Sequence, residues 1–163
     1  MGGAGLVGGG SGPEASAKIA TNTSVNIGNG VTITALFGNL NIDATSKSDI
    51  YAYAYRHMGA LAGDNKSKAT ITATENTIIT IGGSGDQSYL NSRNTQIKAN
   101  LHQKLQAKAL SYTVSAGSKT EAETSVTATD NTRVTINKAY IGGTDRLDII
   151  ATVENLYVHS ESY

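Results

Sequence analysis

Histidine side chains are the first candidates for acid–base chemistry, because a histidine exchanges a proton near neutral pH. The chain has three, at His57, His102 and His159. They do not occupy equivalent positions in the sequence repeat described below, and no Ser or Asp stands at a recognisable catalytic spacing from any of them. The pattern favours three solvated histidines in turns or on an outer face, without a catalytic or metal-binding role.

Paired carboxylates could cleave a polysaccharide, one acting as acid and the other as base or nucleophile. The acidic residues are instead scattered, and no tight cluster falls on one expected face. A polysaccharide-active β-helix enzyme is therefore retained only as an alternative, and we expect no enzyme. The acidic candidates are Asp43, Asp49, Asp64, Asp86, Asp130, Asp145, Asp148 and Glu154.

One segment approaches a calcium-binding motif. GGSGDQSYL (82–90) resembles the nonapeptide GGxGxDxUx, whose ligands come from adjacent tandem copies. Here the Asp comes one residue early and the motif is not repeated in tandem, so a turn is the favoured interpretation. The absence of Cys excludes disulfides, thiolate catalysis and zinc–sulfur sites. We expect no metal and no cofactor.

Three tyrosines give the clearest indication of binding. Tyr51, Tyr53 and Tyr55 alternate with Ile50, Ala52 and Ala54. Side chains alternate between the two faces of a strand, so all three rings are predicted to point outward together. Exposed aromatic rings with hydroxyl groups suit contact with sugars or partner proteins. The alternative is an aromatic ridge that packs on neighbouring strands.

The elements that would position these residues belong to a tandem repeat. NTSVNIG (22–28), NTIITIG (76–82) and NTRVTIN (131–137) align residue for residue, as do 40–55, 95–110 and 147–162. The glycine-bearing GLVGGG (5–10), GALAGD (59–64) and VSAGSK (114–119) also correspond. We therefore treat 1–163 as one domain with units 1–55, 56–110 and 111–163. Because the chain starts and stops at unit boundaries, we expect a fragment of a longer array.

Within each unit apolar residues alternate with polar ones, as half-buried strands require. Tandem units must meet equivalent neighbours, which favours an all-β parallel solenoid with a narrow, continuous core over a sandwich. Ala recurs at the inward positions 44, 52, 54, 99, 107, 109 and 151, as suits closely spaced walls. The larger residues predicted to be buried are Val25, Ile27, Ile42, Ile50, Ile79, Ile81, Ile97, Leu105, Val134, Ile136 and Ile149.

Strands of about five residues separated by polar turns would give each unit either three two-sided coils of about 18 residues or two three-sided coils of about 27. With such coils Asn22, Asn76 and Asn131 could not stack on one another, and each is predicted to lie in a turn before a strand. By sequence alignment, His159 and Glu161 fall where Ala52 and Ala54 stand in the first unit.

The succession GLVGGG, NTxVxIGxGVTITA, LNIDATS and an Ala-alternating strand resembles the passenger repeats of bacterial filamentous adhesins. These are the filamentous-haemagglutinin-like and leukotoxin-type proteins of two-partner and related type V secretion. The resemblance covers nearly all 163 residues. It implies a right-handed parallel β-helix, a rod on the cell surface, adhesion to a host-surface protein or glycan, and a secretion signal outside this fragment.

Composition agrees with a thin repetitive β structure: 39% of residues are hydrophobic, 6% are aromatic, and there are 18 Gly. Thirteen basic residues balance thirteen acidic ones, which gives no electrostatic footprint for nucleic acid. No apolar run is long enough to span a membrane. We predict a secreted or cell-surface structural and adhesive rod segment, with a self-assembling extracellular fibre subunit, joined end to end, as a further alternative.

Overall fold

The computed structural model describes residues 12–58, 65–113 and 119–162, and this part of the chain is all-β with parallel sheets. Thr, Val, Ile and alternating Ala favour extended backbone here, because each packs well on a pleated surface. The strands are β1 (Glu14–Ile27), β2 (Thr32–Met58), β3 (Asn65–Ile81), β4 (Ser88–Thr113), β5 (Thr120–Ile136) and β6 (Ala139–Ser162).

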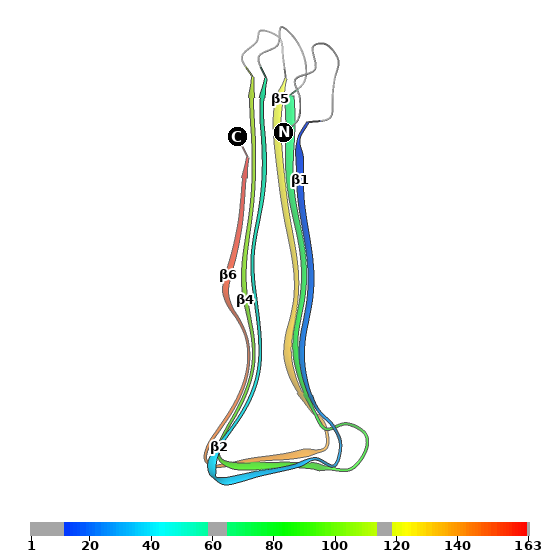
Figure 1. Cartoon of the computed structure of the whole chain (residues 1–163), viewed down its shortest axis with the longest axis vertical. Coiled ribbons are helices and arrows are strands. Elements are labelled where there is room, and N and C mark those ends of the chain that lie inside the picture. The colour runs from blue at the N-terminus through cyan, green and yellow to red at the C-terminus, as the bar shows by residue number, and fades with distance from the viewer. Residues whose placement is uncertain (1–11, 59–64, 114–118, 163) are drawn as a thin grey trace.

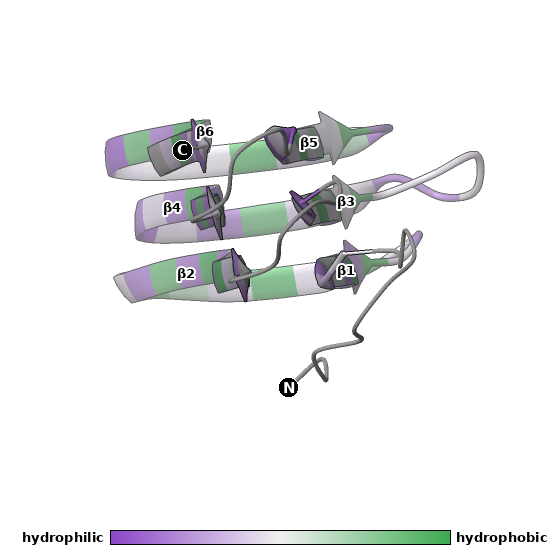
Figure 2. Cartoon of the chain, turned by 90° about the horizontal axis from the view of Figure 1, so that it is seen from above, coloured by the Kyte–Doolittle hydropathy of each residue, from purple (hydrophilic) through white to green (hydrophobic). Residues whose placement is uncertain are grey.

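The strands form two three-stranded parallel sheets, ordered β1-β3-β5 and β2-β4-β6. The two sheets face each other as the long walls of a narrow body (Figure 1). Seen from above, the chain makes three layers, namely β1 with β2, β3 with β4, and β5 with β6 (Figure 2). The middle layer therefore has a neighbour on both sides, whereas the other two each leave one strand edge in each sheet without a described partner.

Each strand pairs with its equivalent in the next repeat, so the predicted parallel pairing is confirmed. Asn22 is opposite Asn76, which is opposite Asn131, and Ile42 is opposite Ile97, which is opposite Ile149. The predicted coils of 18 or 27 residues are wrong, because one repeat makes one layer. Polar stretches taken for turns, such as 45–48, stay extended, since their inward members Ser46 and Ser48 continue the alternation.

The β2-β4-β6 sheet bends sharply near its start, so that its first residues cross the lower end of the molecule (Figure 1). The pairing slips at this bend, between Ala35 and Asn39 on β2. Before the bend, Gly82 connects β3 to the following loop with a φ of 73°. A Cβ at Gly82 would come within 1.8 Å of the Asn137 carbonyl oxygen, so only glycine fits this turn.

Burial of the predicted core depends on the layer. Ile42, Ile79, Ile81, Ile97 and Leu105 are buried as predicted. The prediction is wrong for Ile136 and Ile149, which are 37% and 46% exposed, because they lie in the last layer, beyond which the described residues place no further strand. In the outer layers Val25, Ile27, Ile50 and Val134 are half-buried for the same reason, and Ala151 is exposed.

The core is not continuous along the strands, contrary to the prediction. One hydrophobic cluster surrounds Ile71, Leu105 and the neighbouring alanines, and a second surrounds Ile79, Leu90 and Ile97. Between them the inward positions are mostly polar. We call this set the polar belt; it comprises Thr21, Thr23, Ser46, Ser48, Glu75, Thr77, Gln103, Asp130 and Thr132.

The last strand is displaced by one residue relative to the sequence alignment. A register shift between His102 and Lys104 brings Lys104 opposite Tyr157 and Ala107 opposite Ser160. His159 and Glu161 are therefore opposite Gln106 and Lys108, on the outer face, and do not take the inward positions of Ala52 and Ala54 to which the sequence alignment assigns them. The irregularity moves two ionisable side chains out of the interior, where an unpaired charge is costly.

Among the glycine-bearing segments, 5–10 and 59–64 lie outside the described residues, as does all but the last residue of 114–119. The same holds for part of the first unit, 1–55, and for the junctions after Met58 and Thr113. The predicted boundaries after Tyr55 and Leu110 fall near the ends of β2 and β4, and the division into three units stays a prediction.

A matched pair of substitutions measures the effect of a layer on each side. Ile81 and Ile136 are opposite each other, but Ile81 is fully buried whereas Ile136 is 37% exposed. We expect Ile81→Ala to lower the free energy of unfolding by about 2–5 kcal/mol. Ile136→Ala should cost less than half as much, as measured by urea unfolding. Equal losses would contradict the layer dependence.

Candidate binding surface

The outer face of β2 carries the three tyrosines predicted to bind a ligand. Tyr51, Tyr53 and Tyr55 are 57%, 45% and 52% exposed, while Ala52 and Ala54 between them are buried. The ring centroids of Tyr51 and Tyr53 lie 6.1 Å apart, and those of Tyr53 and Tyr55 lie 6.4 Å apart, with nearly parallel planes. The rings form a row along the strand, as the period-2 alternation predicted; whether they bind a ligand stays a prediction.

Two further aromatic rings extend this row. His57 follows Tyr55 on the same face of β2, and its ring stacks on Tyr112 of β4 at a centroid distance of 5.2 Å. Leu110 is opposite Tyr55, between the tyrosine row and Tyr112. We call this surface the aromatic patch; it comprises Tyr51, Tyr53, Tyr55, His57, Leu110 and Tyr112.

Sequence reasoning missed Tyr112 and Leu110, although the signal was present. Tyr112 continues the outward alternation of 106, 108 and 110, and its partner in the neighbouring repeat is His57. The sequence prediction was limited to Tyr51, Tyr53 and Tyr55, whose equivalents in the second repeat are Gln106, Lys108 and Leu110. Because Leu110 and Tyr112 lie directly opposite Tyr55 and His57, the patch extends onto β4 beyond the three tyrosine positions. The alignment also placed Val158 opposite Gln106, whereas the structure places His159 there.

The three histidines lie at different register positions on three strands. His57 stacks on Tyr112, and His159 stacks on Tyr157 at 6.0 Å. His102 lies 2.8 Å from the Asn100 amide nitrogen and 3.7 Å from Glu154. Each therefore contacts its own neighbours on the outer face, and the fold does not assemble the three into one centre.

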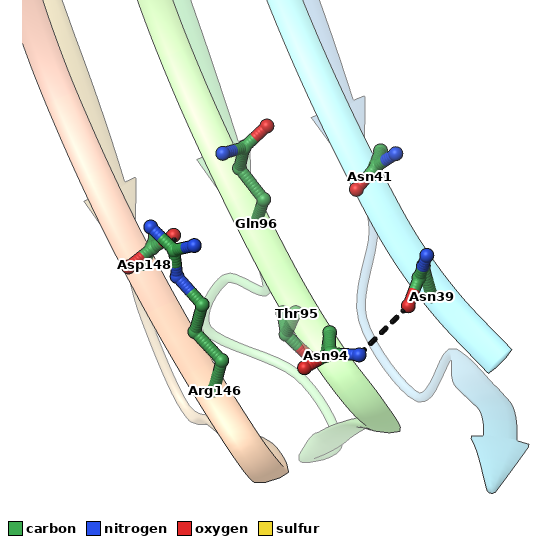
Figure 3. A pocket seen from close by; sticks show the side chains of 7 residues that line it. All are labelled: Asn39, Asn41, Asn94, Thr95, Gln96, Arg146 and Asp148. Carbon is green, nitrogen blue, oxygen red and sulfur yellow. Dashed lines mark hydrogen bonds and ion pairs between the residues drawn. The ribbon is translucent and has the colours of Figure 1, made fainter. Parts of the chain in front are cut away.

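A polar pocket of about 330 Å³ lies near the bend of the same sheet. Figure 3 shows the Asn94 amide donating to the Asn39 carbonyl oxygen, at 2.9 Å, from the neighbouring strand. Arg146 pairs with Asp148 at 2.6 Å on β6. Amide and charged groups of this kind can hydrogen-bond a hydroxyl-rich ligand. The lining residues are Asn39, Asn41, Asn94, Thr95, Gln96, Arg146 and Asp148.

The repeated asparagines stack directly, which corrects their predicted place in turns. Asn22, Asn76 and Asn131 lie within β1, β3 and β5 at one register position, and Asn131 donates to Asn76 at 3.3 Å. The prediction failed because it assumed several coils between equivalent residues. With one layer per repeat, equivalent side chains become neighbours, and the amides of Asn131 and Asn76 hydrogen-bond across the layers.

Charged side chains form pairs across the strands on both outer faces. On the β1-β3-β5 sheet, Lys66 lies 3.4 Å and Lys68 3.5 Å from Glu123, and these cations hold the pKa of Glu123 below its ordinary value. On the other sheet, Lys98 lies 3.4 Å from Glu154. A hydrogen bond from Asn100 and the Lys98 charge lower the pKa of Glu154. Each of these pairs joins a cation of the middle layer to an anion of the last layer.

Comparison with protein-family models, curated proteins and solved structures found no match. The resemblance to filamentous-haemagglutinin-like adhesins therefore stays a prediction.

The candidate calcium segment 82–90 contains the connection between β3 and β4 and the start of β4. Asp86 is exposed there, and its carbonyl oxygen accepts a hydrogen bond from Gly30 at 3.0 Å. Across residues 12–58, 65–113 and 119–162, no group of three or more His, Cys, Asp or Glu side chains could hold a metal ion. In the same residues no helix is long and apolar enough to cross a membrane.

The tyrosine row is expected to contribute little to folding. About half of each ring remains exposed, and substitution of exposed residues usually costs under about 0.5 kcal/mol each. We therefore predict that the triple change of Tyr51, Tyr53 and Tyr55 to Ser lowers the free energy of unfolding by less than about 1.5 kcal/mol. Urea unfolding measures this. A loss several times larger would assign the rings to packing across strands.

Proposed function

We propose that this chain is a structural and adhesive rod segment of a bacterial cell-surface or secreted filamentous adhesin, without catalysis. In this proposal the stacked layers are coils of a right-handed parallel β-helix, each repeat adds one coil, and further repeats lengthen the rod. The export signal would lie outside this segment. The resemblance noted in the sequence supports the adhesin assignment.

The aromatic patch is the observation that carries the adhesive role. The narrow interior already buries the apolar face of β2, so the tyrosines are not required there for folding. Rows of half-exposed aromatic rings with hydroxyl groups suit the apolar faces and hydroxyl groups of sugars, and equally suit a protein surface. The partner we propose is a glycan or protein on a host surface.

Changing the tyrosines tests adhesion. The triple Tyr→Ser change at 51, 53 and 55 should reduce attachment to host cells, or to an array of glycans, at least tenfold. Tyr89 and Tyr140 provide a matched control, because they are also about half exposed and pair at 6.4 Å elsewhere on the same sheet. Changing both to Ser should leave attachment unchanged. Equal losses of attachment in the two variants, or no loss in either, would contradict the proposal.

A second candidate function is a self-assembling fibre subunit. It is favoured by the exposed strand edges of β1 and β2 on one side of the stack and of β5 and β6 on the other. A second copy continuing the same register would bring Glu154 next to Lys47, an attractive contact. It would also bring Glu123 next to Glu14, which opposes stacking at low ionic strength.

An inward lysine at the outer edge tests this stacking. Ala128 points inward on β5 yet is exposed, so a lysine there would place a charge where the next layer must pack. Sedimentation velocity should show concentration-dependent growth for the unmodified chain and a monomer for Ala128→Lys. Thr127→Lys, which adds the same charge on the outward face of the same strand, should still associate. A monomer at every concentration for the unmodified chain would reject the fibre function.

A further inference from the structure

The polar belt contains a carboxylate that no described group satisfies. Glu75 points inward from β3, the middle strand of its sheet, and is fully buried. Neither of its carboxylate oxygens has a hydrogen-bond partner. A buried carboxylate without a partner is costly, and proteins normally pair it with a cation or with hydrogen-bond donors.

A second carboxylate stands directly beside it. Asp130 on β5 is the register partner of Glu75 and also points inward. Burial raises the pKa of Asp130, and the negative charge of Glu75 raises it further, against a hydrogen bond that lowers it. That hydrogen bond comes from the Gln103 amide nitrogen on the opposite sheet, at 3.1 Å. Two acids and one amide therefore converge from both walls.

The oxygens around these groups are also unsatisfied. The Gln103 carbonyl oxygen has no hydrogen-bond partner, although the side chain is 1% exposed. The hydroxyl oxygens of Ser48 and Thr77 are buried without partners as well. Gln103 is aimed at the acids, because its amide nitrogen already contacts Asp130. Unsatisfied oxygens of Gln103 and Thr77 thus lie in the middle layer with Glu75, next to Asp130 of the last layer, and Ser48 adds another from the first layer.

We propose that the polar belt binds one calcium ion between the middle and last layers, held by Glu75, Asp130 and the Gln103 carbonyl oxygen, with hydroxyl groups of the belt completing the set. The site has two carboxylates and otherwise neutral oxygens, with no nitrogen or sulfur ligand. It is separate from the turn at 82–90 and from the aromatic patch.

The donor set selects the ion. Calcium takes six to eight oxygen ligands at about 2.3–2.6 Å in flexible geometry, whereas magnesium requires a near-ideal octahedron. Oxygen donors from two sheets and two layers form an irregular, extended set, which suits calcium better. A divalent charge would neutralise the two carboxylates and supply the partner that Glu75 lacks.

A pocket on the outer face borders the polar belt. A pocket of about 640 Å³ lies beside the register shift of β6. Its lining includes Ser48 and Gln103, two inward members of the polar belt, as well as the outward residues His102, Lys104 and Tyr157. A hydrated ion could therefore reach the belt from this side.

Calcium titration of the whole chain tests the proposal. After removal of divalent ions with EGTA, isothermal titration with CaCl2 should show one site per chain. The unfolding temperature should rise by about 5–10 °C once free calcium exceeds the dissociation constant a hundredfold. MgCl2 should bind at least tenfold more weakly. No calcium binding at millimolar concentration would overturn the proposal, and equal affinity for magnesium would overturn the ion assignment.

Matched variants locate the site. Glu75→Gln keeps the side-chain shape and removes the charge, and it should weaken calcium binding at least a hundredfold. Asp130→Asn, in the more accessible last layer, should weaken it at least tenfold and gives a second measurement should Glu75→Gln fold poorly. Glu123→Gln makes the same chemical change on the outer face of β5 and should leave the affinity unchanged. Unaltered affinity in both belt variants, or a loss in Glu123→Gln, would contradict the site.

Discussion

Parallel pairing of each residue with its equivalent in the next repeat is the constraint on which the rest of this structure depends. Backbone hydrogen bonds fix one layer 4.7–4.9 Å from the next, so side chains at one repeat position must stack, whatever their chemistry. Where they are Ile or Ala, the stack becomes core. Where they are asparagine, Asn131 donates to Asn76, and where acids stack inside, two carboxylates become neighbours. The two hydrophobic clusters, the asparagine stack and the pair of buried acids all follow from this rule.

The same constraint explains which parts of the fold could be predicted. Alternation between apolar and polar residues identified the inward face of β2, where Ala44, Ala52 and Ala54 are buried. The small size of these side chains also indicated that the interior is narrow. It also placed Tyr51, Tyr53 and Tyr55 on the outer face. Both inferences need only the period of a strand, which is local. The tandem repeat then supplied the parallel pairing.

The number of residues in a layer could not be obtained in this way. Asn22, Ser46 and Ser48 are turn formers in isolation, and their presence divided the predicted strands into short pieces. In the stacked structure the same residues remain extended, because their backbone pairs with the strand of the neighbouring layer. The one-residue slip beyond His102 was equally hidden, since identities between the second and third repeats are sparse there. The polar belt lies in the middle of these long strands. Because the prediction divided the strands into short pieces, it did not identify the belt.

The bend of the second sheet has a consequence for how such a chain changes over generations. Three residues lie between Ala35 and Asn39, one between Ser92 and Asn94, and two between Gly143 and Arg146, yet pairing resumes on both sides. The corner therefore absorbs insertions and deletions that would disrupt the long walls. Phe37, which is 95% exposed, stands there without a structural role in the described core. Corners of this kind let duplicated repeats diverge in length and acquire new surface while the ladders beneath them stay aligned.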